Sequence, residues 1–261
     1  MSGAARFEGR GFVVTGGTRG LGRAIVLGAA AEGASVVFCG RAASEGAAAE
    51  VVAAADAAAA GAGARVSFVA ADVSVEADVE RLFDAAVDRL PRLDVLVNNA
   101  GILRDRLLIE TSLDEWNEVL AVNLRGAFLC ARRAIEEILA SGAGGRIVNV
   151  SSIVAGGATG QAAYAASKAA LLSLTRSIAK EYGRRGIACN AVVPGYLETD
   201  MVAALSPEAR RARELLSPER RFGRPEEVAE AVLFLASADA SFVNGDALYV
   251  AGAVRDLPDL R

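Results

Sequence analysis

The chain has 261 residues, of which 53% are hydrophobic and 23% are charged. This composition supplies enough apolar material for one large core and too little charge for an intrinsically disordered protein. The net charge of -4 provides no positive field for nucleic acid or an anionic membrane surface, and the lack of histidine excludes Ser-His-Asp hydrolases and histidine-ligated zinc sites. We therefore expect small-molecule partners, with no nucleic acid, membrane or metal.

The predicted secondary structure alternates between strands and helices along almost the whole chain. Short apolar runs predict strands at Gly11–Thr15, Ser35–Cys39, Arg65–Ala70, Val95–Asn98, Arg146–Val150, Ile187–Val193 and Ala247–Val250. Helices are predicted at Leu21–Ala31, Ala42–Ala60, Val75–Arg89, Leu113–Leu139, Ala163–Tyr182 and Pro225–Ala236. Right-handed crossovers between such strands predict one α/β domain over residues 1–261, a doubly wound Rossmann fold with a mostly parallel seven-stranded sheet and helices on both faces.

One long segment interrupts this alternation. Residues 197–221 contain two prolines and clustered charges, and a connection of that length is often a functional lid. We expect this segment to cover the substrate.

The chain carries no signal for export or membrane insertion. Residues 1–11 contain arginines but no apolar h-region, and the most apolar stretch, Ala24–Ala31, ends at Glu32, far short of a membrane span. The cysteines are odd in number and widely spaced, which argues against a disulfide framework: Cys39, Cys130 and Cys189. A reducing cytoplasm is the expected location.

A glycine-rich turn, Gly16-Gly17-Thr18-Arg19-Gly20-Leu21-Gly22, joins the first strand to the first helix. Glycines at such a junction permit a tight turn and let a pyrophosphate approach the helix N-terminus. A glycine-rich turn alone is sometimes only a turn, but its place after the first strand of an alternating chain favours nucleotide binding.

Several further motifs occur in a fixed order after this turn. They are Asp72-Val73, Asn98-Asn99-Ala100-Gly101, Tyr164-Ala165-Ala166-Ser167-Lys168 and Pro194-Gly195. Together with the spacing Gly-x-x-x-Gly-x-Gly, they make nearly the whole chain resemble a short-chain dehydrogenase/reductase. The resemblance implies a nicotinamide cofactor bound by Gly16, Thr18, Arg19, Gly20, Leu21, Gly22, Arg41, Asp72, Val73, Asn99, Ala100, Gly101, Tyr164, Lys168, Pro194, Gly195 and Thr199.

The second strand predicts which nicotinamide cofactor is used. NAD-selective relatives place an aspartate at the end of this strand, whereas here the position is Gly40. Arg41 follows it, and Arg19 lies in the glycine-rich turn, so the two could bracket a 2′-phosphate. The expected cofactor is NADP(H), although either arginine alone would more often be an ordinary surface residue.

The tyrosine and the lysine also make chemical sense together. Four residues apart on a helix, Tyr164 and Lys168 lie on one face. Lowering a phenol pKa from about 10 to near 7 requires about 4 kcal/mol, roughly what one cation about 4 Å away supplies at an effective dielectric of about 20. A lone Tyr-x-x-x-Lys is usually a surface pair, but the upstream motifs favour a proton donor, Tyr164, made more acidic by Lys168.

The resemblance implies two further catalytic residues. A serine at the end of the fifth strand would orient the substrate carbonyl, and matching the strand end selects Ser152, whereas counting back from the tyrosine selects Ser151. Asn123 matches a helix asparagine that holds a water on a proton path from Lys168 to solvent. As an isolated residue it would more often be a hydrogen-bonded helix polar group.

Within the family, the chain is most similar to 3-oxoacyl-[acyl-carrier-protein] reductases, which implies hydride transfer to the ketone of a 3-oxoacyl thioester. The similar segments are residues 101–105, 198–201 and 222–227. The alternatives are a ketoreductase or alcohol dehydrogenase acting on a free polyketide or cyclic ketone and, in a different class, a non-catalytic NADP-binding regulator.

The resemblance also implies a homotetramer and a possible protein partner. An acidic acyl carrier protein could dock on Arg184 and Arg185, although Ala143 stands where carrier-using relatives often have another basic residue. Leu248–Ala253 stands where relatives commonly carry an Asp-Gly-Gly after the last strand, and this loss leaves the exact tetramer interface open.

Overall fold

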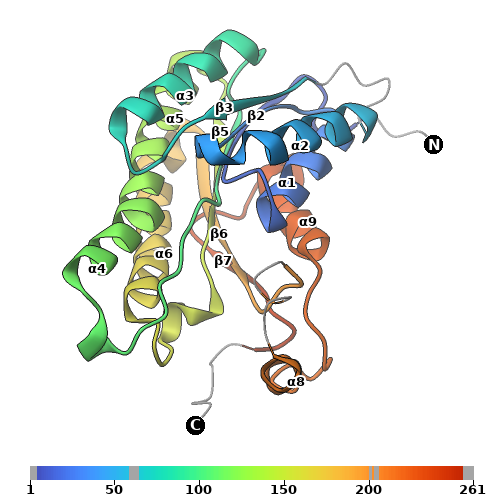
Figure 1. Ribbon diagram of the computed structural model, residues 1–261. Coiled ribbons are helices and arrows are strands. Elements are labelled where there is room, and N and C mark those ends of the chain that lie inside the picture. Colours follow the sequence, from blue (N-terminus) through green and yellow to red (C-terminus); the bar gives the residue numbers. More distant parts are fainter. Residues whose placement is uncertain (1–4, 59–64, 200–201, 203–205, 255–261) are drawn as a thin grey trace.

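The computed structural model describes residues 5–58, 65–199, 202 and 206–254. Their strands form one parallel seven-stranded sheet in the order β3-β2-β1-β4-β5-β6-β7, which confirms the predicted fold (Figure 1). The strands are β1 (Gly11–Thr15), β2 (Ser35–Gly40), β3 (Val66–Ala70), β4 (Val95–Asn98), β5 (Gly145–Val150), β6 (Ile187–Pro194) and β7 (Ala247–Val250).

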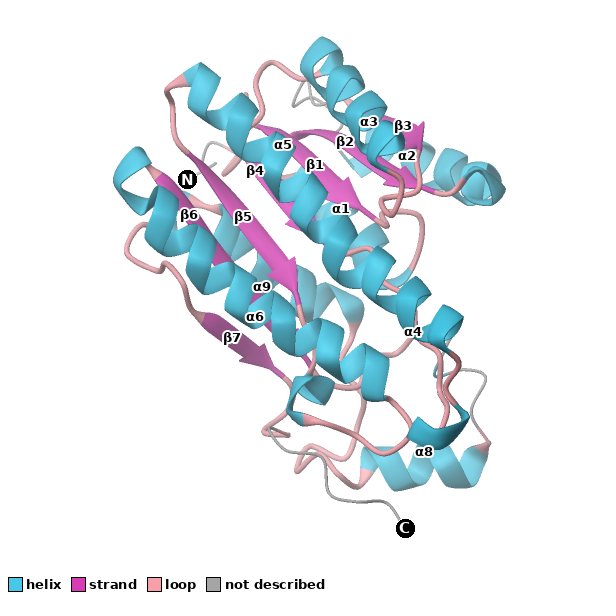
Figure 2. Ribbon diagram, turned by 90° about the vertical axis from the view of Figure 1, so that its left-hand side faces the viewer, coloured by secondary structure: helices cyan, strands magenta, loops and turns pink. Residues whose placement is uncertain are grey.

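Helices cover both faces of the sheet, as expected for a doubly wound fold (Figures 1 and 2). One face carries α1 (Gly20–Ala31), α2 (Glu45–Ala58) and α9 (Pro225–Ala236), which share a core with β1 and β2. The other carries α3 (Glu76–Arg89), α4 (Leu113–Leu120), α5 (Gly126–Ser141) and α6 (Ala162–Tyr182). Every residue of β1, β4 and β6 is buried, because both faces of these strands are covered. Within the described residues, no helix is both long and apolar enough to cross a membrane.

The order of the strands determines where the loops diverge. β1 pairs with β2 on one side and with β4 on the other. The strand order therefore runs outward in one direction from β1 through β2 to β3 and in the other from β4 to β7. Ligands of such sheets bind at the carboxyl ends of the strands beside this switch point. The glycine-rich turn follows β1, and the Asn98–Gly101 motif ends β4, so both lie at that place.

The helix predicted at Leu113–Leu139 is not regular. A π-helical segment, Ala121–Arg125, separates α4 from α5, and Asn123 lies at its centre. Such segments often occur at functional sites. Short 3-10 turns cover Ala42–Ser44, Leu108–Glu110, Ile153–Gly156, Gly183–Arg185 and Ala238–Ala240.

The two ends of the segment predicted as a lid lie side by side. Leu197 forms a parallel bridge with Gly223, and the Glu198 N–H donates to the Gly223 oxygen at 2.8 Å. Within the segment, α8 (Pro207–Glu214) begins with proline at its first turn, and the Ser206 side chain accepts from the Ala209 N–H. Residues 200, 201 and 203–205 of the predicted lid lie outside the described residues. Lid closure therefore stays a prediction.

Candidate active site

The glycine-rich turn has a backbone that only glycine accommodates without strain. Gly16 and Gly20 have φ angles of +69° and +51°. A Cβ at Gly16 would lie 2.9 Å from the Ala100 Cα, and one at Gly22 would lie 2.0 Å from the Gly16 oxygen. The turn is therefore packed tightly against the end of β4.

Asn99 holds this turn in place. Its Nδ2 donates to the Thr15 and Gly16 oxygens at 2.9 and 3.0 Å, so both amide hydrogens are used. In return, Thr15 Oγ1 accepts from the main-chain N–H groups of Asn99 and Ala100, each at 3.0 Å. Asn99 was predicted to contact the cofactor, and the structure shows that its side chain positions the turn.

The first helix presents an N-terminus suited to an anion. No side chain caps α1, and its first turn contains no acidic residue, so its free N–H groups can bind a phosphate. Arg19 and Arg41 are exposed beside it and form no ion pair within the described residues. A Cβ at Gly40 would lie 2.9 Å from Thr18 Cγ2, so a larger residue there would require Thr18 to shift. These features fit a phosphorylated nicotinamide dinucleotide.

Other predicted cofactor residues come together at the same edge of the sheet. Thr199 faces the turn, since its Cγ2 lies 3.6 Å from the Cβ position of Gly20. The Asp72 Oδ1 accepts from the Ser74 N–H and hydroxyl, at 2.9 and 2.7 Å, which orients its carboxylate. Val73 is buried, and Leu21 lies in the first turn of α1.

The end of β6 is fixed by the end of β7. The Gly195 N–H donates to the Val250 oxygen at 3.1 Å, and a Cβ at Gly195 would lie 2.9 Å from the Ala251 Cα. Pro194 is the last residue of β6 and is buried. The Pro194-Gly195 motif therefore has a rigid position beside the site.

Tyr164 and Lys168 lie on the first turns of α6. The buried Lys168 Nζ donates to the Val150 oxygen at 2.7 Å and lies 5.5 Å from the centroid of the Tyr164 ring. Burial lowers the pKa of Lys168 to about 8. The pKa of Tyr164 is raised by burial, which outweighs the lowering effect of a side-chain hydrogen bond with Ser152.

The expected acidification of Tyr164 by Lys168 is therefore not seen. The ammonium donates to a main-chain carbonyl, and the Asp105 carboxylate raises the pKa of Tyr164 further, by less than burial does. The predicted effect assumed a cation about 4 Å from the phenol. In this structure, Tyr164 is a phenol that stays protonated at neutral pH, the form that a proton donor needs.

The two serines at the end of β5 have different partners. The buried Ser151 hydroxyl donates to the Lys168 main-chain oxygen at 2.9 Å and so ties β5 to α6. The Ser152 oxygen accepts from the Val154 N–H at 3.3 Å, which leaves its proton free to donate toward Tyr164 or a substrate oxygen. The geometry favours Ser152 as the serine that faces the site.

Asn123 is buried in the π-helical segment and holds the chain that follows Gly101. Its Oδ1 accepts from the Ile102 N–H at 2.8 Å, and its Nδ2 donates to the Ile102 oxygen at 3.0 Å and to Ser167 Oγ at 3.1 Å. A Cβ at Gly101 would lie 3.4 Å from this Oδ1 and 3.5 Å from the Lys168 Nζ. The side chain thus positions the backbone next to Lys168, and its role in a proton path stays a prediction.

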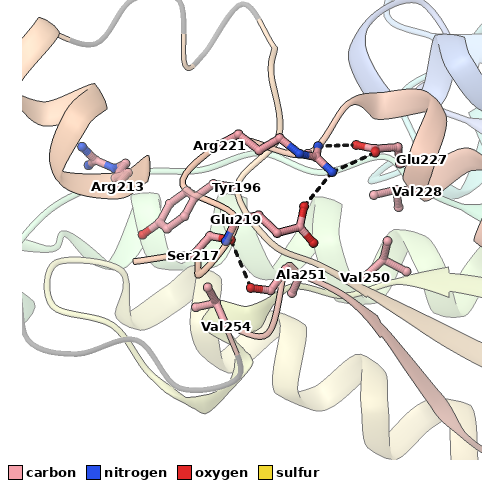
Figure 3. A pocket seen from close by; sticks show the side chains of 12 residues that line it. Tyr196, Arg213, Ser217, Glu219, Arg221, Glu227, Val228, Val250, Ala251 and Val254 are labelled. Carbon is pink, nitrogen blue, oxygen red and sulfur yellow. Dashed lines mark hydrogen bonds and ion pairs between the residues drawn. The ribbon is translucent and has the colours of Figure 1, made fainter. Parts of the chain in front are cut away.

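A separate cavity of about 180 Å³ lies under the C-terminal part of the predicted lid (Figure 3). None of the residues predicted as catalytic lines it. Its walls are Tyr196, Arg213, Ser217, Glu219, Arg221, Gly223, Glu227, Val228, Val250, Ala251, Gly252 and Val254. No local pattern predicts this cavity, because its walls come from four separate parts of the chain.

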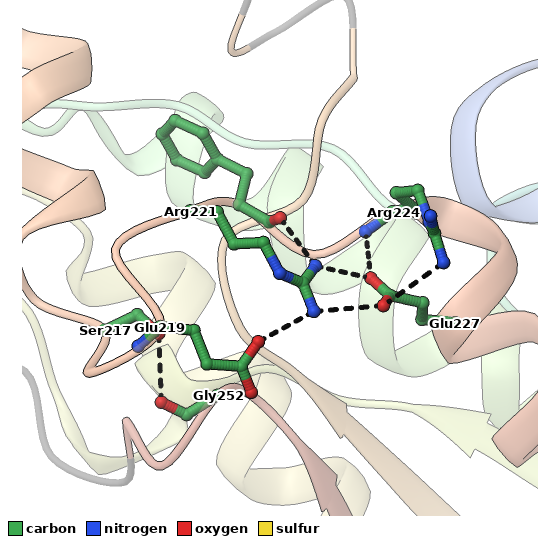
Figure 4. Close-up of polar contacts among 7 residues, drawn as sticks. Ser217, Glu219, Arg221, Arg224, Glu227 and Gly252 are labelled. Carbon is green, nitrogen blue, oxygen red and sulfur yellow. Dashed lines mark hydrogen bonds and ion pairs between the residues drawn. The ribbon is translucent and has the colours of Figure 1, made fainter.

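Ion pairs hold this part of the lid to α9 (Figure 4). Arg221 binds both Glu227 carboxylate oxygens, at 2.8 and 3.0 Å, and Glu219 at 2.7 Å. The Arg221 guanidinium holds the pKa of Glu227 at about 2. On the other side, the Ser217 hydroxyl donates to the Gly252 oxygen at 3.1 Å. These contacts anchor the C-terminal end of the segment predicted as a lid.

One residue near Tyr164 was missed by the sequence analysis. Gln161, directly before α6, donates from Nε2 to the Asp105 Oδ1 at 2.8 Å. Its position three residues before the tyrosine was the available signal, because such residues share a helix face.

Comparison with known proteins identifies the family. Residues 16–254 match the family model described as enoyl-(acyl carrier protein) reductase. The chain belongs to the short-chain dehydrogenase/reductase family. The protein is thus an oxidoreductase that acts on the CH–OH/C=O pair with a nicotinamide cofactor.

Its relatives match along almost their whole length. The 3-oxoacyl-[acyl-carrier-protein] reductases FabG of Aquifex aeolicus and Escherichia coli are 40% and 39% identical to this chain, each over 95% of it and 98% of the relative. A crystal structure described provisionally as a gluconate dehydrogenase from Agrobacterium tumefaciens is 33% identical, with a TM-score of 0.89, over 98% of this chain and 99% of that one. Relatives that share this fold are therefore named for different substrates.

Proposed function

We propose that this protein is an NADPH-dependent reductase that converts the ketone of a 3-oxoacyl thioester to an alcohol. The observation that carries the proposal is the grouping of Ser152, Tyr164 and Lys168 beside the glycine-rich turn at the carboxyl edge of the sheet. Relatives named 3-oxoacyl-[acyl-carrier-protein] reductase, about 40% identical over nearly the whole chain, support the substrate class.

Each side chain has a distinct part in the reaction. When bound, the reduced nicotinamide supplies the hydride that the ketone carbon accepts. Ser152 donates a hydrogen bond to the ketone oxygen and stabilises the negative charge that develops there. Tyr164, protonated because its pKa is raised, gives its proton to that oxygen, and the alcohol is complete.

Lys168 serves the site by position and charge. With a pKa of about 8, it is largely protonated at neutral pH, and its ammonium donates to the Val150 oxygen and so holds the end of β5 beside the Tyr164 ring. Family resemblance adds a ribose contact for Lys168 and a water held by Asn123 that returns the proton. The structure supports NADPH over NADH through the exposed Arg19 and Arg41 and the close approach of Thr18 to Gly40.

The intact Ser152, Tyr164 and Lys168 set argues against a non-catalytic NADP-binding regulator. A reductase of free polyketides or cyclic ketones remains the alternative, and it would differ in the lid and in residues 153–160. We further propose a cytoplasmic homotetramer, as the family resemblance implies.

A carrier protein that delivers the substrate is a separate part of the proposal. Arg184 and Arg185 are exposed in the turn after α6, about 30 Å along that helix from Tyr164 at 1.5 Å per residue. A carrier docked there could serve this subunit's own site only through a long arm. If charge reversal at both arginines leaves the rate with a carrier-bound substrate unchanged at low salt, docking at this turn is excluded.

The substrate class is tested by following NADPH consumption with acetoacetyl thioesters, aromatic polyketide analogues and simple cyclic ketones. We expect the highest kcat/KM with the thioesters. A preference of tenfold or more for a cyclic ketone would replace the proposed substrate by the alternative, and turnover of none would favour the regulator.

A further inference from the structure

The segment from Ile102 to Arg106 is fixed at both ends by residues next to the catalytic pair. At one end, the Asn123 side chain bonds both main-chain groups of Ile102 beside Lys168. At the other end, the Arg106 N–H donates to the Gly160 oxygen at 2.8 Å, and Arg106 forms a parallel bridge with Gln161. The segment thus connects the neighbourhood of the lysine to the start of the helix that carries the tyrosine.

A side-chain bond reinforces the second attachment. Gln161 occupies the N-cap position of α6, yet its side chain caps no helix N–H. Its Nε2 instead donates to the Asp105 Oδ1 at 2.8 Å. Gln161 directly precedes α6, and its main-chain oxygen accepts from the Ala165 N–H at 2.8 Å, so this bond acts on the first turn, which carries Tyr164.

Asp105 lies between two arginines that are paired with other carboxylates. The flanking Arg104 and Arg106 are paired with Glu118 and Glu115, each at 2.9 Å, and Asp105 forms no ion pair within the described residues. The first turn of α6 contains no acidic residue of its own, and Asp105 is the carboxylate bonded to the residue at its N-cap, the end of a helix where negative charge is favourable.

We propose that Asp105 and Gln161 form a positioning pair that holds the first turn of α6, and with it the Tyr164 hydroxyl, in the orientation that proton transfer needs. This inference rests on the proposed function, since it assigns Tyr164 the role of proton donor. Neither residue needs to touch the substrate for this effect.

The pair also has an electrostatic consequence. The Asp105 charge raises the pKa of Tyr164, together with the larger effect of burial, while the hydrogen bond with Ser152 lowers it. Lys168, 5.5 Å from the ring centroid, is the nearby cation on the same helix. Asp105 therefore helps to keep the phenol in its protonated form.

The charge is tested with Asp105→Asn, whose side-chain oxygen can still accept from Gln161. Phenol ionisation is followed by ultraviolet difference absorbance, with the same variant in a Tyr164→Phe background subtracted to isolate this tyrosine. We expect the titration to move to lower pH. Glu110→Gln, which removes an equal charge nearby on the chain, is the control and should leave it unmoved. Equal titrations in wild type, Asp105→Asn and Glu110→Gln would overturn the electrostatic part.

The bond is tested with Gln161→Leu, which keeps the Asp105 charge but removes the donor. We expect kcat to fall about tenfold, because a misplaced catalytic group slows the chemical step, while the dissociation constant of NADPH stays within about twofold. Gln161→Glu, which places a second carboxylate against Asp105, should lower kcat further at neutral pH than at pH 5. Unchanged kcat in Gln161→Leu would overturn the positioning role. The absorbance titration needs no substrate, so it remains decisive even if no ketone is reduced.

Discussion

The Lys168 ammonium nitrogen lies over the Tyr164 ring, 5.5 Å from its centroid. Lys168 is buried, and burial lowers its pKa from 10.5 to about 8. The pair therefore combines a lysine whose pKa is lowered with a tyrosine whose pKa is raised.

This shift predicts a dependence of stability on pH. Because the pKa of Lys168 is lower in the folded than in the unfolded protein, the unfolded state binds more protons between pH 8 and 10.5, and this lysine's contribution to the free energy of unfolding rises across that window. Relative to Lys168→Met, wild type should gain up to about 3 kcal/mol over this range. Denaturant unfolding at several pH values measures the difference, and a difference that is flat or falls with pH would contradict the assignment.

The two serines at the end of β5 should separate catalysis from stability. Ser152→Ala should lower kcat about a hundredfold with little change in unfolding free energy, since it removes a donor to the developing oxyanion. Ser151→Ala should lower the unfolding free energy by about 1 kcal/mol, since it removes the bond to the Lys168 oxygen, and it should affect kcat much less. Steady-state kinetics and urea unfolding of both variants check this, and the reverse pattern would select Ser151.

Cofactor choice is predicted to depend on Arg41. Hydrogen bonds to charged groups contribute roughly 1.5 to 3 kcal/mol, so Arg41→Ala should weaken NADPH binding about tenfold to a hundredfold and leave NADH almost unaffected. Dissociation constants of both coenzymes for both proteins test it. Equal losses for the two, or a wild type that prefers NADH, would show that the assignment is wrong.

The turn after β7 predicts a stabilising substitution. Ala253 has a φ of +66°, a conformation that costs an alanine about 1 kcal/mol relative to glycine. Ala253→Gly should therefore raise the unfolding free energy by several tenths of a kcal/mol, after the entropy that glycine gives the unfolded chain is deducted. As a control, Gly252→Ala should destabilise, since its Cβ would lie 2.6 Å from Ser217 Oγ. A melting temperature that falls in Ala253→Gly would contradict this account.

The sequence predicted the strands, the sheet edge and the grouping of the motifs, because buried parallel strands and glycine-rich turns leave clear local patterns. It did not predict the π-helical segment around Asn123, whose residues carry no proline or other local break. It predicted that Lys168 lowers the pKa of Tyr164, whereas burial and the Asp105 carboxylate raise it. Asp105 lies 59 positions before Tyr164 in the chain, and no local sequence pattern connects the two residues. The ion pairs of Arg221 were equally hidden, since exposed charges in a loop do not reveal their partners.

Replacement of Tyr164 by phenylalanine tests the central claim most directly. NADPH binding is measured by fluorescence titration, and reduction of an acetoacetyl thioester is followed in single turnovers that separate chemistry from product release. The account predicts a dissociation constant within about threefold of wild type and a reduction rate at least a hundredfold lower, because only the proton donor is removed. A variant that reduces the thioester at nearly the wild-type rate would show that Tyr164 is not the proton donor.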